Sequence, residues 1–308
     1  MTELPVRVLA RRDEAEGVFR LDLAAADGAA LPPWSPGAHI DVSVAEAGVR
    51  QYSLCGDPGH ENRWRIAILR EPRGRGGSEW LYRNAHEGAE LRVSPPRNNF
   101  ELVNSDAYVF VAGGIGITPI LPMLAAAEAR GARWELFYGA RSRAHFAFTG
   151  ELASRPGVRL VAQDTDGLLP IAEIVAGAGD AAIYCCGPEP LLAAVETAAA
   201  ATGSAVYAER FAPKAIVTGP DEPFEVRLAR TGTTHRVGAT QSIADVLEAA
   251  GVPVITSCRE GTCGSCETAV VTGDIDHRDS VLTEAERVRG DTMMLCVSRA
   301  AGVLVLDL

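Results

Sequence analysis

Three cysteines lie close together near the end of the chain, in the stretch TSCREGTCGSCET. They are Cys258, Cys263 and Cys266, and a fourth, Cys296, follows in TMMLCVSRA. The spacing is therefore C-x4-C-x2-C, then 29 residues, then a single cysteine. Structural zinc sites usually bring two closely spaced cysteine pairs, and only one such pair exists here. The spacing is typical of a [2Fe–2S] cluster held by four thiolates.

Two glycines inside this loop support the same interpretation. Gly261 and Gly264 lack a Cβ, so the backbone can curl around a cluster and present N–H groups to its sulfides. A zinc site, and free or disulfide-bonded cysteines, remain as alternatives. The odd total of seven cysteines fits a disulfide framework poorly.

Length and charge limit the classes of protein that this chain can represent. Its 308 residues are enough for two or three domains. The formal net charge of −11 argues against a surface for nucleic acid or anionic lipid. No uncharged apolar run approaches the roughly 20 residues of a membrane span, and no signal peptide is evident. We therefore expect a cytoplasmic protein, where clustered cysteines bind metals more often than they form disulfides.

The elements that must position these cysteines fall into several blocks. Residues 1–103 contain short strands punctuated by Gly, Pro, Asp and Asn, which predicts an antiparallel β-barrel. Residues 104–211 alternate buried-type strands with helices, which predicts an α/β domain with a parallel sheet. Residues 212–223 lack apolar periodicity and predict a linker. Residues 224–308 predict a compact α+β unit around the cysteines.

Two motifs of the α/β block are typical of ligand-binding turns. In FVAGGIGITPI, Gly114 and Gly116 leave backbone N–H groups free at a helix N-terminus, which is suited to a phosphate. We expect Thr118 to cap this helix and Pro119 to begin it. The third glycine of G-x-G-x-x-G is absent, so an ordinary tight turn remains an alternative. The second motif, CCGPEP, begins at the carboxyl end of a later strand, the edge where open α/β sheets bind ligands.

Together these motifs resemble known electron-transfer families. The four cysteines, the SIADVLEAAG helix and MMLCVS resemble the plant-type ferredoxins, from about Glu222 to Leu308. The two α/β motifs resemble the nicotinamide-binding half of the ferredoxin–NADP reductase superfamily, and RQYSL at 50–54 matches its R-x-Y-S flavin motif. The domain order, with PRNNF at 96–100 and ERF at 209–211, resembles the phthalate dioxygenase reductase group, which includes vanillate O-demethylase reductases. The implied fold is multidomain: a flavin-binding antiparallel β-barrel, a parallel-sheet nucleotide domain and a β-grasp ferredoxin-like domain.

The resemblance also implies where each cofactor binds. Arg50 would neutralise a flavin phosphate, Tyr52 would lie against the isoalloxazine, and the Ser53 hydroxyl would reach flavin N5. The other residues implied at the flavin are Ala67, Ile68, Leu69, Gly76, Gly77, Ser78 and Phe211. The residues implied at the nicotinamide nucleotide are Gly114, Gly116, Thr118, Cys186, Gly187 and Pro188. The implied cluster ligands are Cys258, Cys263, Cys266 and Cys296. We assign catalytic roles to Ser53, at flavin N5, and to Cys186, beside the nicotinamide.

The group resembled carries FMN rather than FAD, and the sequence has no obvious clamp for an adenine. The group mostly uses NADH, although Arg141 and Arg143 could pair with the 2′-phosphate of NADPH. A Rieske cluster needs two histidine ligands, and neither His235 nor His277 has a matching spacing, so the chain is not itself the oxygenase.

The function implied is electron transfer from NADH to FMN, to the [2Fe–2S] cluster and then to another protein. The implied acceptor is a Rieske-type non-haem iron oxygenase that hydroxylates or O-demethylates an aromatic or similar molecule. A reductase for a cytochrome P450 is one alternative, and a redox sensor is another. We expect a monomer, and we expect Arg259 and Glu260, beside the cysteines, to belong to the face that docks the oxygenase.

Overall fold

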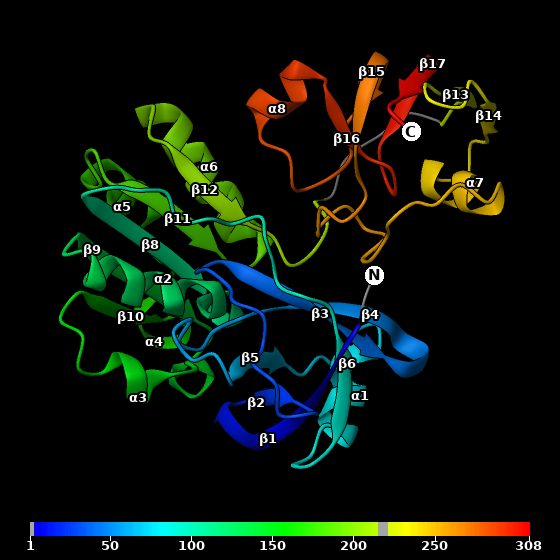
Figure 1. Ribbon diagram of the computed structural model, residues 1–308. Helices are drawn as coiled ribbons and strands as arrows, with labels where there is room; N and C mark the ends of the chain where they lie inside the picture. The colour runs from blue at the N-terminus through cyan, green and yellow to red at the C-terminus, as the bar shows by residue number, and fades with distance from the viewer. Residues whose placement is uncertain (1–2, 215–220) are drawn as a thin grey trace. The chain divides into compact units, whose positions relative to one another are not determined.

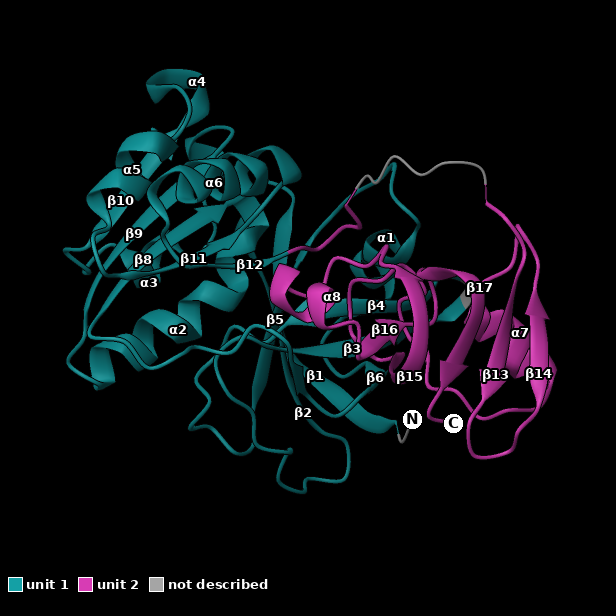
Figure 2. Ribbon diagram, turned by 90° about the horizontal axis from the view of Figure 1, so that it is seen from above, with its two compact units in different colours: residues 1–209 teal, residues 210–308 magenta. Residues whose placement is uncertain are grey.

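Two compact units, residues 1–209 and 210–308, make up the chain (Figure 2). The computed structural model describes residues 3–214 and 221–308 (Figure 1). The expected linker, residues 212–223, therefore lies partly outside the described residues.

The first block folds as the predicted antiparallel barrel. Its strand order is β4-β3-β6-β1-β2-β5, with β7 paired to β3. An isolated bridge between Leu54, directly after β4, and Ile66 of β5 joins the two ends of this order. Buried alternating residues of the strands, among them Phe19, Ile40 and Trp64, fill the interior. The elements are β1 (Leu4–Ala15), β2 (Val18–Ala25), β3 (Ala38–Val44), η1 (Ala45–Ala47), β4 (Gly48–Ser53), β5 (Trp64–Leu69), α1 (Gly77–Asn84), β6 (Glu90–Val93) and β7 (Arg97–Asn98).

The second block has the predicted parallel sheet, in the order β10-β9-β8-β11-β12. Successive residues of β8 enter different cores, because side chains alternate across a strand. Phe110 packs in the core that contains α2, and Val111 packs in the core that contains α5 and α6. The elements are β8 (Ala107–Gly113), η2 (Gly114–Gly116), α2 (Ile117–Ala129), β9 (Arg133–Ala140), η3 (Arg143–His145), α3 (Thr149–Leu152), β10 (Val158–Ala162), α4 (Gln163–Asp166), α5 (Ile171–Gly177), β11 (Ala182–Cys186), α6 (Glu189–Thr202) and β12 (Val206–Glu209).

The second unit contains a mixed sheet in the order β14-β13-β17-β15-β16. The predicted hairpin is present, since β13 pairs antiparallel with β14 and Gly232 takes a left-handed φ of +72° between them. The predicted helix, α7, begins after a capping box formed by Ser242 and Asp245. The elements are β13 (Phe224–Leu228), β14 (Thr234–Val237), α7 (Ile243–Ala249), β15 (Glu267–Asp276), α8 (Glu284–Arg289), β16 (Thr292–Met294) and β17 (Arg299–Leu306). None of the helices that the structure describes has the length and apolar character of a membrane span.

The connection from the barrel to the parallel sheet is held by a buried tyrosine hydroxyl. Tyr184 of β11 accepts a hydrogen bond from the Val103 N–H at 2.8 Å and donates one to the Glu101 carbonyl at 2.8 Å. Burial raises the pKa of this tyrosine to about 12, so it stays protonated at physiological pH. The ring also stacks on Tyr207 of β12 at a centroid distance of 4.8 Å.

We expect Tyr184→Phe to lower the free energy of unfolding of the first unit by about 1–3 kcal/mol, because a backbone N–H loses its partner. Tyr207→Phe is the matched control, since its hydroxyl makes no hydrogen bond to a described residue and the stacking survives. All four tryptophans lie in this unit, so fluorescence during urea denaturation measures the effect. Equal stability of the two variants would contradict the anchoring role.

Candidate functional site

The four cysteines converge in the second unit. Cys258, Cys263 and Cys266 lie between α7 and β15, and Cys296 lies between β16 and β17. All four are buried free thiols. Hydrogen bonds from Cys263 and then Cys296 lower the pKa of Cys258, and Cys296 also bonds to Cys266. The same hydrogen bonds raise the pKa of Cys263 and Cys296, so the four sulfurs form one hydrogen-bonded group in which Cys258 and Cys266 are the thiols that lose a proton most readily.

Backbone N–H groups surround these sulfurs. The N–H groups of Glu260 and Thr262 donate to Cys258 Sγ at 3.3 and 3.4 Å, and the N–H of Cys258 donates to Cys263 Sγ at 3.5 Å. Gly261 permits this curl with a φ of +72°, and a Cβ there would come within 2.6 Å of Val297 Cγ2. Donors of this kind stabilise the negative charge of an iron–sulfur cluster, so the loop fits the predicted group.

An ion pair holds the cysteine loop against α7. Arg259 has a left-handed φ of +56° and pairs with Asp245 at 2.7 Å and with Glu248. Glu248 also accepts a hydrogen bond from Thr256 Oγ1 at 3.0 Å. The charge of Arg259 is therefore neutralised within the unit, and its ion pairs with α7 hold the cysteine loop in place. The predicted docking role of Arg259 and Glu260 stays a prediction.

In the first unit, the R-x-Y-S residues and the GRGGS loop lie side by side. Arg50 donates to the Arg75 carbonyl at 3.0 Å, and a Cβ on Gly77 would come within 2.6 Å of Arg50 Cγ. A guanidinium thus sits at the N-terminus of α1, where Gly76 is the N-cap in a left-handed conformation. Positive charge and free N–H groups at one point suit a flavin phosphate. The Ser78 hydroxyl, however, accepts from the Glu71 N–H at 3.0 Å.

The remaining residues predicted at the flavin divide by strand alternation. Ala67 and Leu69 of β5 face the core shared with the parallel sheet, and Ile68 is buried inside the barrel. Only the backbone of Ile68 is therefore left to meet a ligand. Tyr52 is largely buried, and burial raises the pKa of its hydroxyl. Phe211 belongs to the second unit, where its residue surface is 43% exposed, and its place at the flavin stays a prediction.

The two nucleotide motifs come together at the carboxyl ends of β8 and β11. A Cβ on Gly116 would lie 2.2 Å from the Cys186 carbonyl oxygen, so only glycine allows this approach. A Cβ on Gly187 would lie 3.0 Å from Gly113 Cα, and a Cβ on Gly113 would lie 2.7 Å from Pro188 Cδ. This juxtaposition places the predicted nucleotide residues at one edge of the sheet, as expected for a ligand-binding α/β fold.

Thr118 does not have the predicted capping role. Helix α2 begins at Ile117 after Gly116 as N-cap, and no side chain caps it. Thr118 is buried and its hydroxyl donates to the Ile115 carbonyl at 3.0 Å, because the turn of η2 precedes the helix. Pro119 accordingly lies in the first turn rather than at its first position.

Glu209 is a further buried residue of this site, which the sequence analysis named only within the ERF match at 209–211 and gave no role. It ends β12 in register with Cys186, whose thiol pKa is raised first by burial and then by the Glu209 carboxylate. Burial raises the pKa of Glu209 to about 8, an effect that the nearby Ser53 hydroxyl partly offsets. Its Oε2 and the Ser53 Oγ are shielded from solvent and have no well-formed hydrogen bond to a described residue. The neighbours of Glu209 in the structure are Ser53 and Cys186, the two predicted catalytic residues. In the sequence, the only sign of such a role was a carboxylate at the end of a parallel strand.

Comparisons with known proteins show which family the chain resembles. The model of the 2Fe-2S iron-sulfur cluster binding domain matches residues 226–301. The chain is 43% identical to the phenoxybenzoate dioxygenase subunit beta of Ectopseudomonas oleovorans, over 100% of this chain and 98% of that protein. It is 38% identical to the phthalate dioxygenase reductase of Burkholderia cepacia, over 99% of this chain and 97% of that protein.

Solved structures show the same architecture. A phthalate dioxygenase reductase, described as a modular structure for electron transfer from pyridine nucleotides to [2Fe–2S], matches 99% of this chain and 98% of its own with a TM-score of 0.71 and 38% identity. An intact type IV self-sufficient cytochrome P450 monooxygenase matches 99% of this chain with a TM-score of 0.92 and 38% identity. This chain spans only 41% of that P450 chain.

The raised pKa of Glu209 predicts a pH dependence of flavin reduction by NADH. The carboxyl group is neutral below its pKa of about 8 and becomes charged as the pH rises through it. A negative charge beside Ser53 and Cys186 opposes the arrival of hydride, so the rate should fall several-fold above this pH. Glu209→Gln should remove the fall. Anaerobic stopped-flow measurement of flavin absorbance at a series of pH values tests this, and superimposable pH profiles would contradict it.

Proposed function

The chain belongs to the family of phthalate dioxygenase reductase-type oxygenase reductases, and from this premise we propose that its electron acceptor is a Rieske-type non-haem iron oxygenase. The chain is an NADH-dependent oxidoreductase whose cofactors are FMN and a [2Fe–2S] cluster. An oxygenase component is its partner, as for relatives named as reductase subunits of dioxygenase or monooxygenase systems. Because the relatives are oxidoreductases, the redox-sensor alternative has no support.

One observation carries the proposal. The chain aligns over almost its whole length with reductases named for phthalate dioxygenase and vanillate O-demethylase. Phthalate and vanillate are both aromatic acids. Two further relatives are named for aromatic compounds, phenoxybenzoate and toluene-4-sulfonate. We infer that the partner oxygenase hydroxylates or O-demethylates an aromatic compound.

The residues of the first unit have the following proposed roles. Arg50 and the N-terminus of α1 bind the FMN phosphate, and Tyr52 lies against its ring system. The first turn of α2, which no side chain caps and which Gly116 brings close to Cys186, meets the NADH pyrophosphate. Ser53, Cys186 and Glu209 line the point of hydride transfer, where Glu209 holds a proton at neutral pH. The protein's contribution is positioning and a matched electrostatic environment, rather than covalent catalysis.

In the second unit, we propose that Cys258, Cys263, Cys266 and Cys296 hold the cluster. When bound, FMN takes two electrons as a hydride and the cluster takes electrons one at a time, which is the conversion that the chain provides. The N–H groups of Glu260 and Thr262 stabilise the charge on Cys258, and Arg259 fixes the loop that carries them.

A cytochrome P450 is the second candidate acceptor, and one observation favours it. The self-sufficient P450 monooxygenase contains a segment that matches 99% of this chain with a TM-score of 0.92. The same module can therefore serve haem as well as non-haem oxygenases, and the fold of the reductase does not distinguish the two.

Reconstitution with purified partners tests the proposal. The chain should support NADH-dependent product formation by a Rieske oxygenase, with little or none by a separate P450. The opposite preference would establish the second candidate. Anaerobic titration with NADH, chromatography of the released flavin and an iron count provide the control, which should give FMN and two irons per chain. FAD, or zinc without iron, would contradict the cofactor assignment.

A further inference from the structure

Asp279 is a buried carboxylate that lies against the cysteine loop and takes no part in the proposed hydride transfer or cluster ligation. Asp279 is fully buried in the segment between β15 and α8. It lies against the loop at Gly261, where a Cβ would come within 3.0 Å of Asp279 Cα and 3.3 Å of its Cβ. Burying a carboxylate is costly unless it is paired and hydrogen-bonded, so its contacts indicate what it does.

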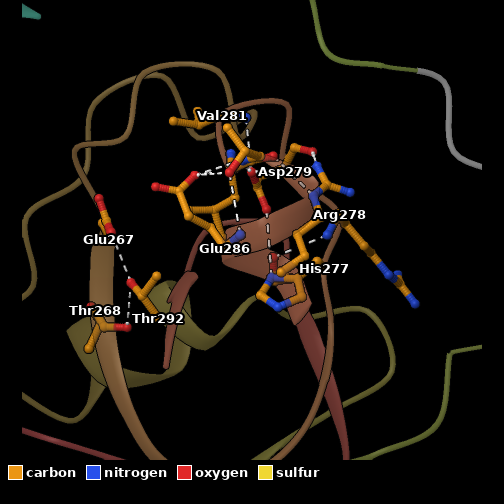
Figure 3. Close-up of polar contacts among 12 residues, drawn as sticks. Glu267, Thr268, His277, Arg278, Asp279, Val281, Glu286 and Thr292 are labelled. Carbon is orange, nitrogen blue, oxygen red and sulfur yellow. Dashed lines mark hydrogen bonds and ion pairs between the residues drawn. The ribbon is translucent and has the colours of Figure 1, made fainter. Parts of the chain in front are cut away.

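Asp279 fixes the turn that follows it. Its Oδ1 accepts hydrogen bonds from the N–H groups of Val281 at 2.9 Å and Leu282 at 2.7 Å. Figure 3 shows the carboxylate between this turn and the ring of His277, whose Nδ1 lies 3.9 Å from Asp279 Oδ2. A side-chain acceptor of this kind gives the turn a single conformation.

Arg287 of α8 holds the same turn from the other side. Its Nη2 donates to the Asp279 carbonyl at 2.6 Å, and its Nε donates to the Leu282 carbonyl at 3.2 Å. The same guanidinium lies 3.8 Å from Asp279 Oδ1. The turn is thus fixed at both its first and last residues by one arginine.

A chain of hydrogen bonds leads from this turn to a proposed cluster ligand. The Ser280 N–H donates to the Gly261 carbonyl at 2.8 Å. That carbonyl and the Thr262 N–H belong to one planar peptide unit, so the first bond orients the second group. The Thr262 N–H in turn donates to Cys258 Sγ at 3.4 Å. Linked hydrogen bonds polarise one another, which strengthens the final N–H···S bond.

We propose that Asp279 is a positioning residue that sets the reduction potential of the [2Fe–2S] cluster, by fixing the relay from Ser280 through Gly261 and Thr262 to Cys258. The inference rests on the proposed function, because it requires Cys258 to be a cluster ligand. Hydrogen bonds to the sulfurs favour the reduced cluster, which carries one more negative charge. An intact relay therefore raises the potential.

The negative charge of Asp279 acts in the opposite direction, since a nearby anion disfavours the reduced cluster. Two variants separate these effects. Asp279→Asn and Asp279→Ala both remove the charge, but only asparagine keeps an Oδ1 that can accept from Val281 and Leu282. The comparison between them isolates the positioning effect.

The test uses the full-length, cluster-loaded protein in a spectroelectrochemical titration at about pH 8, where His277 is neutral because burial lowers its pKa below the ordinary value. At equal applied potential, we expect the ratio of reduced to oxidised cluster to be roughly fivefold lower in Asp279→Ala than in Asp279→Asn. This is the effect of one weakened hydrogen bond. Equal potentials of the two variants would overturn the inference.

Asp276→Asn is the matched control for charge removal. Asp276 lies three residues earlier and pairs with Arg278, with its side chain 50% exposed. No hydrogen bond or ion pair joins it to a described residue of the cysteine loop. We therefore expect the ratio of reduced to oxidised cluster in this variant to stay within twofold of the wild-type ratio at the same applied potential. A larger shift in this control than between the two Asp279 variants would also overturn the inference.

If Asp279→Ala does not retain the cluster, Arg287→Lys carries the test, since lysine keeps the charge but cannot reproduce the two-point contact with the turn. A lower potential than that of the wild type supports the inference, and an unchanged potential overturns it. Failure of the proposed function is recognised separately, because wild-type protein would then lack the [2Fe–2S] spectrum altogether.

Discussion

The proposed sites for the cluster, the flavin phosphate and the nucleotide each have to accommodate negative charge, and at each of them we infer that backbone N–H groups held in fixed directions do so. At the cysteine loop, three such groups point at sulfur. At the starts of α1 and α2, a glycine is the N-cap and no side chain caps the helix. Donors that are already oriented require no rearrangement when the charge arrives, which is why such sites serve both for binding and for electron transfer. The rest of the structure serves to keep these backbone segments in place.

Glycine at close contacts is the means by which the segments reach their positions. Gly116 against the Cys186 carbonyl brings two distant turns to one sheet edge, and Gly261 against Asp279 brings the cysteine loop onto the turn before α8. Ion pairs then fix what the glycines allow. Arg259 ties the cysteine loop to α7, and Arg287 ties the neighbouring turn to α8.

The parts of the fold and site that could be predicted from the sequence are those encoded locally. Cysteine spacing predicted that the four thiols come together, strand periodicity predicted the barrel and the parallel sheet, and the glycine-rich turns predicted the meeting of two loops at one sheet edge. The burial of Glu209 and Asp279 could not be found in this way, because it depends on how distant parts of the chain pack around each carboxylate. The capping role expected of Thr118 was wrong for a related reason. The η2 turn before α2 starts the helix earlier than its residue types indicate.

The central claim is that electrons enter this chain at the flavin and leave through the cluster. Rapid mixing of the oxidised protein with NADH under anaerobic conditions, with flavin and cluster absorbance followed separately, tests this order most directly. The account predicts that flavin absorbance falls first and that cluster absorbance falls in a later phase. Replacement of Cys263 by serine should leave the first phase intact and abolish the second. Reduction of the cluster before the flavin, or at the same rate in protein depleted of flavin, would contradict the account.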